Sequence, residues 1–209
     1  MISVEPGPNR DALGFEPAVL SSFDFLATDG FRCVHSDSTT VRYEKRISLG
    51  LNGVFVSVHH GHGSFELSVW IGRKRPAKYL VDVMEVVRWS GAYEAEGLGK
   101  NAPGFQVSSR ENVEKLVARL AQLVSEYGGP FTRGDRKAFS DVLTRRRRGW
   151  QDYEKEVQLR KMREEAEMAW HRKDLSHVVK LYRPFASDLK PFEVKRLEYA
   201  RKYENLTHP

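Results

Sequence analysis

Three histidines within four residues, His59-His60-Gly61-His62, form the most conspicuous cluster of chemically active side chains in the sequence. Neutral imidazole is a good ligand for zinc, copper or nickel. Adjacent residues of a β strand point to opposite faces, so His59 and His60 do not meet at one ion if this segment is a strand. Only His60 with His62, or His59 with a carboxylate such as Glu66, would converge, and neither set supplies three ligands. We therefore expect a polar hairpin tip without a metal or cofactor, and keep a metal-dependent enzyme as the less favoured alternative.

A second set of polar and aromatic residues shares one face of the strands that alternation predicts. The candidates for binding a partner are Arg42, Glu44, Phe55, His59, Glu66 and Trp70. On a binding surface, Phe55 and Trp70 would be the anchors and Arg42 would make polar contacts. A catalytic interpretation needs Glu44 or Glu66 as a general base beside His59, and no nucleophile, phosphate-binding loop or metal set supports it. A third interpretation, that a helical arm of the same chain covers this face, stays open.

Arginines form two short clusters. Arg145, Arg146, Arg147 and Arg148 precede Gly149, and Arg73 and Arg75 lie in a separate basic run. Four consecutive residues wrap around a helix, and cations in a last helical turn also interact favourably with the helix dipole. Aromatic rings beside arginines, here Trp150 and Tyr153, can stack on bases. The clusters therefore indicate either a solvated helix end or nucleic-acid binding, which is the alternative function.

Composition limits the class of protein. The chain has 209 residues, a net charge of +6 from 34 basic and 28 acidic residues, and a pI of about 9.4. A basic protein is attracted to polyanions, whether nucleic acid, anionic lipid or an acidic protein. The single cysteine, Cys33, excludes an internal disulfide and favours a cytoplasmic protein. No apolar run approaches the roughly 20 residues that span a bilayer, and the first residues lack a secretory pattern, so we expect no membrane contact.

The elements that must position these residues begin with a helix at about 16–28. Strands are expected at 31–35, 39–47, 54–60 and 63–72. A two-residue turn at Gly61-His62 predicts the pairs Val58–Phe65, Val56–Leu67 and Val54–Val69. Every pair is apolar, and a slip of one residue would destroy this separation of faces. We therefore predict an antiparallel meander of three or four strands that is buried on one face.

Helices are predicted for most of the remaining chain. One spans 78–89, a glycine-rich loop covers 91–104, and a capping box that begins at Ser108 opens a helix that ends at Gly128-Gly129-Pro130. Residues 135–206 have helical patterns throughout, and Gly149 is expected to bend or end the first of these helices. The prediction is an α+β fold in three parts: a flexible lead-in at 1–14, an α+β domain at 15–130, and a helical extension at 131–209.

A segment at about 164–205 resembles a tetratricopeptide-type helical hairpin. The residues that carry the resemblance are Ala166, Ala169 and Trp170, then Lys173-Asp174-Leu175 at the turn, then Val178, Val179 and Tyr182, with Pro191 near the close of the unit. Pro184 and Phe185 depart from the family pattern, and only one full unit is present, whereas such arrays need about three. The resemblance implies a protein-contact element.

The N-terminal part is similar in outline to small bacterial α+β proteins of unknown role, among which are immunity proteins that neutralise toxins. Helical-hairpin residues and surface aromatics are present, whereas no catalytic set is recognised. The leading hypothesis is therefore a non-catalytic protein-binding module, either an adaptor or an immunity-like protein, with an unidentified protein partner. The sequence does not specify the oligomeric state.

Overall fold

The structure of the protein is a computed structural model that describes residues 10–47, 53–61, 65–75, 79–99, 105–107 and 109–203. The chain divides into two compact units, Met1–Arg145 and Arg146–Pro209, which we call the N-terminal and C-terminal units. The boundary lies later than the predicted 130/131 junction because Phe139 and Val142 pack into the core of the N-terminal unit. The α+β class is as predicted.

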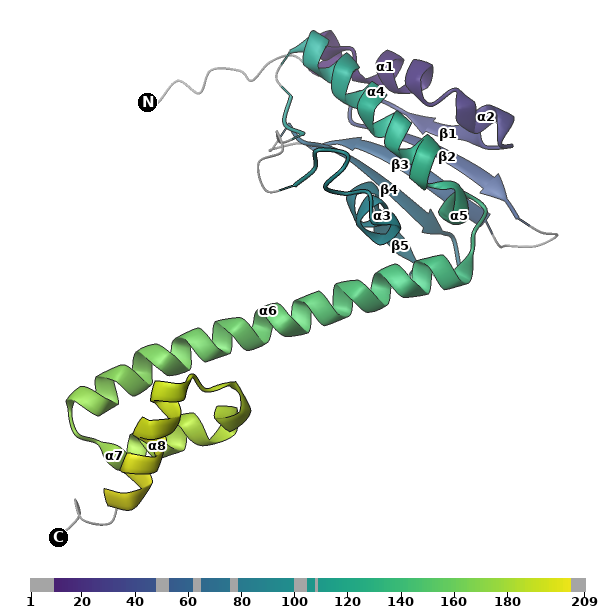
Figure 1. Cartoon of the computed structure of the whole chain (residues 1–209). Helices are drawn as coiled ribbons and strands as arrows, with labels where there is room; N and C mark the ends of the chain where they lie inside the picture. The colour runs from purple at the N-terminus through teal and green to yellow at the C-terminus, as the bar shows by residue number, and fades with distance from the viewer. Residues whose placement is uncertain are drawn as a thin grey trace, which may run out of the picture. The chain divides into compact units, whose positions relative to one another are not determined.

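The N-terminal unit contains a five-stranded antiparallel sheet in the order β1-β2-β3-β4-β5 (Figure 1). The strands are β1 (Arg32–Ser36), β2 (Thr40–Arg46), β3 (Gly53–His60), β4 (Leu67–Arg73) and β5 (Leu80–Asp82). The meander is confirmed, whereas the fifth strand was not predicted. It occupies the first residues of the segment expected to be a helix at 78–89.

The pairing of β3 with β4 differs from the predicted register. Val58 lies opposite Val69 and Val56 lies opposite Ile71. The predicted turn at Gly61-His62 is wrong, because the Gly61 N–H donates to the Glu66 carbonyl at 2.8 Å and a longer connection follows. His62 itself lies outside the described residues. The displacement is an even number of residues, so each side chain keeps its predicted face.

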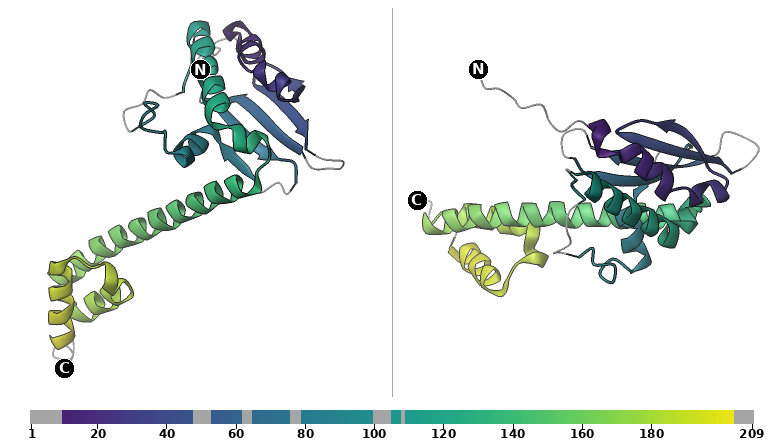
Figure 2. Two further views of the ribbon diagram at one scale, coloured as in Figure 1. Left: turned by 45° about the vertical axis from the view of Figure 1, so that its right-hand side comes forward. Right: turned by 90° about the horizontal axis from the view of Figure 1, so that it is seen from above.

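Helices cover one face of this sheet (Figures 1 and 2). They are the 3₁₀ turn η1 (Arg10–Leu13), α1 (Phe15–Ser22), α2 (Phe25–Thr28), α3 (Val83–Ser90), α4 (Arg110–Tyr127) and α5 (Gly129–Thr132). The helix expected at 16–28 is thus divided in two. The Ser109 side chain caps α4 by accepting the Asn112 N–H at 3.4 Å, one residue later than the predicted cap. Ser108 lies outside the described residues.

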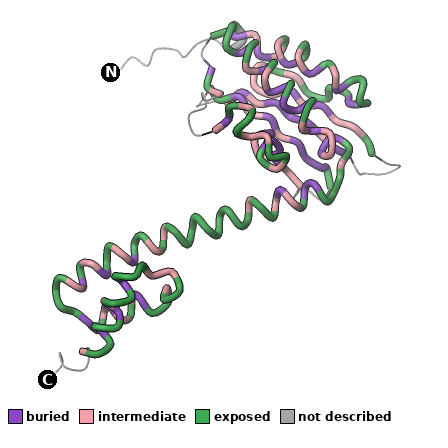
Figure 3. The backbone as a smooth tube through the Cα atoms, viewed as in Figure 1, coloured by how far each residue is buried: buried purple, intermediate pink, exposed green. Residues whose placement is uncertain are grey.

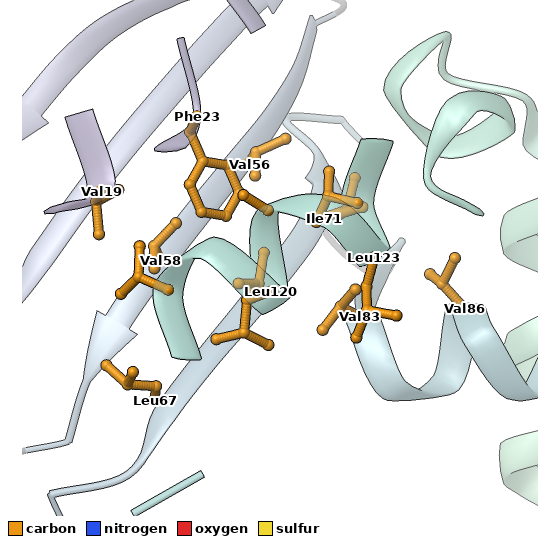
Figure 4. Packing of buried hydrophobic residues seen from close by; sticks show 14 of the residues in the cluster. Val19, Phe23, Val56, Val58, Leu67, Ile71, Val83, Val86, Leu120 and Leu123 are labelled. Atoms are coloured by element: carbon orange, nitrogen blue, oxygen red, sulfur yellow. The ribbon is translucent and has the colours of Figure 1, made fainter. Parts of the chain in front are cut away.

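The core lies between these helices and the sheet, and the buried residues of this unit gather there in Figure 3. Figure 4 shows its centre, where Val19, Phe23, Val56, Val58, Leu67, Ile71, Val83, Val86, Leu120 and Leu123 meet. Burying a valine or leucine side chain stabilises the fold by about 1.5–3 kcal/mol. The core therefore fixes which face of the sheet is inside, and so which side chains the opposite face presents.

The C-terminal unit is helical. The helix α6 (Arg136–His171) continues into it and is followed by α7 (Leu175–Tyr182), the 3₁₀ segment η2 (Arg183–Asp188) and α8 (Pro191–Tyr203). Helix α6 does not end at Gly149, because one glycine costs only about 1 kcal/mol in a helix interior. Ala166 and Ala169 are fully buried where α6 packs with the later helices. The Asp174 carboxylate caps α7 by accepting the His177 N–H at 3.1 Å.

Candidate functional site

The sheet face opposite the core carries a hollow with a volume of about 540 Å³. It is lined by His35, Thr40, Arg42, Phe55, Ser57, His59, Trp70 and Leu80. These eight residues come from all five strands. Sites of this size that combine apolar walls with a few convergent polar groups are typical of ligand binding. We call this site the sheet hollow.

The wall of the sheet hollow is a stack of two side chains from neighbouring strands. The Arg42 guanidinium carbon lies 4.0 Å from the centre of the Phe55 ring, a favourable cation–π distance. Phe55 in turn lies across from Gly72, where an added Cβ would stand 2.5 Å from the Phe55 ring. The Phe55 ring can therefore pack over residue 72 only because glycine has no side chain.

Glu44 lies between two cations at the edge of this stack. Its Oε1 accepts the Arg42 Nε–H at 3.1 Å, and its other oxygen pairs with the Lys74 ammonium. Two positive charges thus surround one negative charge, so the group retains a net positive charge. A catalytic interpretation would need Glu44 or Glu66 as a general base, and both oxygens of Glu44 are engaged by these cations.

His59 lies on the floor of the sheet hollow between two hydroxyl groups. Its Nε2 is 2.8 Å from the Ser57 hydroxyl, and its Nδ1 is 3.2 Å from the Thr40 hydroxyl. Burial lowers the pKa of His59 below the ordinary 6.5, and the neighbouring Arg42 charge lowers it further, while Asp37 opposes the change. The ring is therefore neutral at pH 7, and both of its nitrogens are committed to these hydroxyls.

The rim of the sheet hollow is held by the turn between β1 and β2. Asp37 Oδ1 accepts the backbone N–H groups of Thr39 and Thr40, each at 2.8 Å. Asp37 Oδ2 lies 2.9 Å from Nε2 of His35. These hydrogen bonds, led by the one from the Thr39 backbone, hold the pKa of Asp37 well below its usual range. The carboxylate therefore stays ionised and fixes two lining residues.

Trp70 and Leu80 give the sheet hollow an apolar side. Trp70 lies directly opposite Ser57 on the neighbouring strand, and Leu80 lies opposite Gly72. Both side chains are half-buried. Side chains directly opposite on antiparallel strands are separated by about 5 Å at Cβ. An apolar surface thus adjoins the polar group formed by Arg42, Ser57 and His59.

Of the predicted candidates for partner binding, Arg42, Phe55, His59 and Trp70 line the sheet hollow and Glu44 lies beside them. Glu66 does not line it; it directly precedes β4 and forms an isolated bridge with Gln106. His60 points into the core, where its ring packs between Phe15 and Phe65 at centroid distances of 5.6 and 5.8 Å. Within the described part of the chain, no group of three His, Cys, Asp or Glu residues is placed to hold a metal ion.

The predicted basic surface is only partly present. Arg73 is buried with 5% exposure, and its guanidinium donates to the Gly134 carbonyl. The prediction that Arg73 contacts nucleic acid is therefore wrong. Arg75 is exposed. Arg145 is also bound within the N-terminal unit, where it donates to the carbonyls of Arg88 and Trp89 at the end of α3.

The remaining arginines of the run belong to the C-terminal unit. Arg147 and Arg148 are exposed, and Arg146 is half-buried. The run lies in the middle of α6, not in the last turn of a helix as predicted, because α6 continues past Gly149. The interaction with a helix dipole that was expected there is therefore absent.

Four lining residues were not among the predicted site residues, namely His35, Thr40, Ser57 and Leu80. An irregularity in β1 between Cys33 and His35 shifts the register there and places His35 opposite Arg42, and Thr40 is the first residue of β2. Leu80 belongs to β5, where the sequence pattern predicts a helix. Thr40, Arg42 and Glu44 alternate along β2 and so share one face. This alternation could have identified Thr40 as a site residue.

Comparisons with protein-family models, curated proteins and solved structures found no match for this chain. Across the residues that the structure describes, helices long and apolar enough to cross a membrane are absent.

Proposed function

We propose that the chain is a non-catalytic protein-binding module and that the sheet hollow is its main contact surface. The observation that carries this proposal is the Arg42–Phe55 stack beside Trp70 on the sheet face opposite the core. Tryptophan and arginine are the residues that most often dominate the binding energy of protein interfaces. An adaptor or immunity-like protein, cytoplasmic and bacterial, fits this proposal.

Two observations favour binding over catalysis at this site. Both carboxylate oxygens of Glu44 face cations, so Glu44 has no free lone pair for a substrate proton. The Ser57 hydroxyl beside His59 Nε2 belongs to a residue that is only 3% exposed, so it is not presented to a substrate as a nucleophile.

The C-terminal unit provides a second candidate contact surface. Its helical hairpin carries the residues that resemble a tetratricopeptide-type unit, and exposed apolar side chains lie along α8. Phe192 and Tyr199 are each 51% exposed. The Arg196 guanidinium lies 5.1 Å from the Trp170 ring and pairs with Glu167. We propose that this surface makes additional protein contacts.

Site-specific photo-crosslinking tests the proposal. A benzoylphenylalanine in place of Ser68, which lies opposite His59 on the hollow side of β4, should give discrete protein adducts in the native cells. The matched control places the same group at Lys115, an exposed residue of α4 on the other side of the sheet. Equal adducts from both positions, or adducts to nucleic acid alone, would contradict the proposal.

Nucleic-acid binding is the second candidate, and one observation favours it. Trp150 and Tyr153 are 66% and 60% exposed, with ring centres 6.2 Å apart, one turn beyond the exposed Arg147 and Arg148. Exposed rings next to cations are the arrangement that binds single-stranded nucleic acid by stacking.

A further inference from the structure

The guanidinium of Arg42 is oriented and keeps hydrogen-bond donors for a ligand. Its plane is supported by the Phe55 ring at 4.0 Å, and its hydrogen bond to Glu44 uses Nε. Within the described part of the chain, its two terminal nitrogens have no protein acceptor. Two such N–H groups side by side match the geometry of a carboxylate.

The hydroxyls next to Arg42 provide a further donor. Ser57 lies directly opposite Arg42 on β3, and Thr40 lies two residues before Arg42 on the same side of β2. A neutral His59 ring donates through one nitrogen and accepts through the other. Because Ser57 is only 3% exposed and Thr40 is half-buried, the Thr40 hydroxyl is the one that a ligand can reach. When Ser57 donates to the ring and the ring donates to Thr40, the Thr40 O–H is left for a ligand. This donor adjoins Arg42.

We infer that the sheet hollow binds an acidic segment of a partner protein, with a carboxylate held by Arg42 and the Thr40 hydroxyl and an adjoining apolar side chain against Trp70 and Leu80. This inference rests on the proposed function and names the chemistry of the partner. Arg42 is the lining residue with a permanent charge. The two carboxylates beside the hollow are already engaged, Glu44 by Arg42 and Lys74 and Asp37 by the N–H groups of Thr39 and Thr40 and by His35, whereas the terminal N–H groups of Arg42 are open to an acidic ligand. The net charge of +6 on the whole chain favours an acidic partner in addition.

Selection of random 12-residue peptides displayed on phage against the full chain tests this inference. The selected peptides should carry Asp or Glu beside a large apolar residue. Each peptide is then synthesised in two forms, one with its carboxylates and one with the matching amides. Both forms are titrated by fluorescence polarisation against the wild type and R42Q, with K115Q as a control that removes an exposed positive charge of α4.

We expect R42Q to weaken binding of the acidic peptide by about tenfold or more, as for a lost charge-assisted hydrogen bond. The amide peptide should bind the wild type and R42Q alike, because the charge that Arg42 contacts is then missing. R42K should restore binding only in part, because an ammonium group has no planar fork. K115Q should leave both affinities unchanged. W70A should weaken both peptides, whereas W150A should weaken neither.

The outcomes separate this inference from the proposed function. Selected peptides that lack acidic residues and bind less tightly to W70A would overturn the inference and leave a protein-binding hollow. Equal effects of R42Q on the acidic and amide forms would overturn it too. Peptides whose binding responds to neither R42Q nor W70A would contradict the proposed use of the hollow itself. Thermal unfolding of each variant ensures that the comparison is between folded proteins.

Discussion

Arg163 and Glu193 form a partly buried ion pair inside the C-terminal unit, with Arg163 Nε 2.8 Å from Glu193 Oε1, the Glu193 side chain 2% exposed and the Arg163 side chain 32% exposed. The second Glu193 oxygen accepts the backbone N–H of Lys190 at 2.7 Å. The guanidinium also donates to the Asp188 carbonyl at 3.2 Å. One carboxylate thus connects α6 to the start of α8, in a unit with a small apolar core.

Removal of Glu193 should destabilise the C-terminal unit strongly. E193A removes the charge-assisted hydrogen bonds of Glu193 to Arg163 and to the Lys190 N–H, a change that costs about 1.5–3 kcal/mol because Arg163 is partly exposed and water can solvate its charge. Urea unfolding followed by far-UV circular dichroism measures the loss. As a control, E114A removes the exposed pair with Arg110 on α4 and should cost about 1 kcal/mol or less. Similar losses for E193A and E114A would show that the pair at Glu193 does not hold these helices together.

Substitution of Gly72 should displace the Phe55 ring. In G72A the new methyl group would meet Phe55 at 2.5 Å and the Leu80 side chain at 3.0 Å. Overpacking of this kind costs about 1–3 kcal/mol. Urea unfolding should show this loss, and the F55A background should reduce it because the ring is then absent. A G72A protein as stable as the wild type would contradict the close contact.

The ionisation of Asp82 should make stability fall as the pH rises. Burial raises its pKa from 3.8 to about 6, against the effect of the Met84 N–H that it accepts. Between these values the unfolded state releases the proton more readily than the folded state, so folding stability declines from about pH 4 to pH 6. The full decline corresponds to at most about 3 kcal/mol, and partial solvation of the group makes it smaller.

The variant D82N separates this charge from the helix cap. Asparagine is as good an N-cap as aspartate and carries no charge. D82N should therefore unfold at higher urea than the wild type near pH 7.5, with a flatter profile between about pH 4 and 6. D82A loses the cap at α3 and should be less stable than D82N by about 1 kcal/mol. A D82N protein that is destabilised near pH 7.5 would contradict the raised pKa.

The ionisation of His59 should make stability rise with pH, whereas that of Asp82 should make it fall. Its folded-state pKa lies below 6.5, so the unfolded state takes up the proton first as the pH falls, and stability is lost below about pH 6.5. The nearby charges that act on the ring are those of Arg42 and Asp37. H59Q keeps a donor and an acceptor without titrating, and it should reduce this loss. Titration of the His59 ring proton by NMR measures the pKa directly, and a midpoint above 6.5 would contradict its burial.

The nucleic-acid alternative makes a salt-dependent prediction. If the exposed part of α6 binds single-stranded RNA, affinity for mixed-sequence RNA should fall steeply as salt rises. R147Q with R148Q should reduce the salt slope by about 2, because each arginine would neutralise one phosphate. W150A should weaken binding with the slope unchanged, because stacking involves no ion release. Retention on heparin that disappears at modest salt in the wild type would rule out this alternative.

The strand pattern predicted which side chains share a face but not the exact pairing. Val56 and Val58 are inside and Phe55 and His59 are outside, as alternation requires. The partner of Val58 is Val69, not Phe65, because the connection after Gly61 is longer than two residues. Several registers with the same parity pair apolar residues equally well, so composition alone could not choose among them.

Two other differences have separate physical causes. Leu80, Val83 and Val87 follow helical spacing, and this concealed a three-residue strand that ends where Asp82 caps α3. Arg73 belongs to a run of charges, which suggests solvent exposure. However, Arg73 lies on the same inward face of β4 as Val69 and Ile71. Its buried guanidinium donates a hydrogen bond to the Gly134 carbonyl. The alternation along β4 was a signal for the burial of Arg73, but the carbonyl partner, 61 residues away, was not visible in the sequence.

The hydrogen bonds of Asp37 have a consequence for the kinetics of recognition. They order His35 and Thr40 before any ligand binds, so binding would cost little conformational entropy at the β1–β2 rim of the sheet hollow. A preformed rim of this kind favours rapid docking without rearrangement of the backbone. Differences in affinity among related ligands would then reside mainly in how slowly each one dissociates.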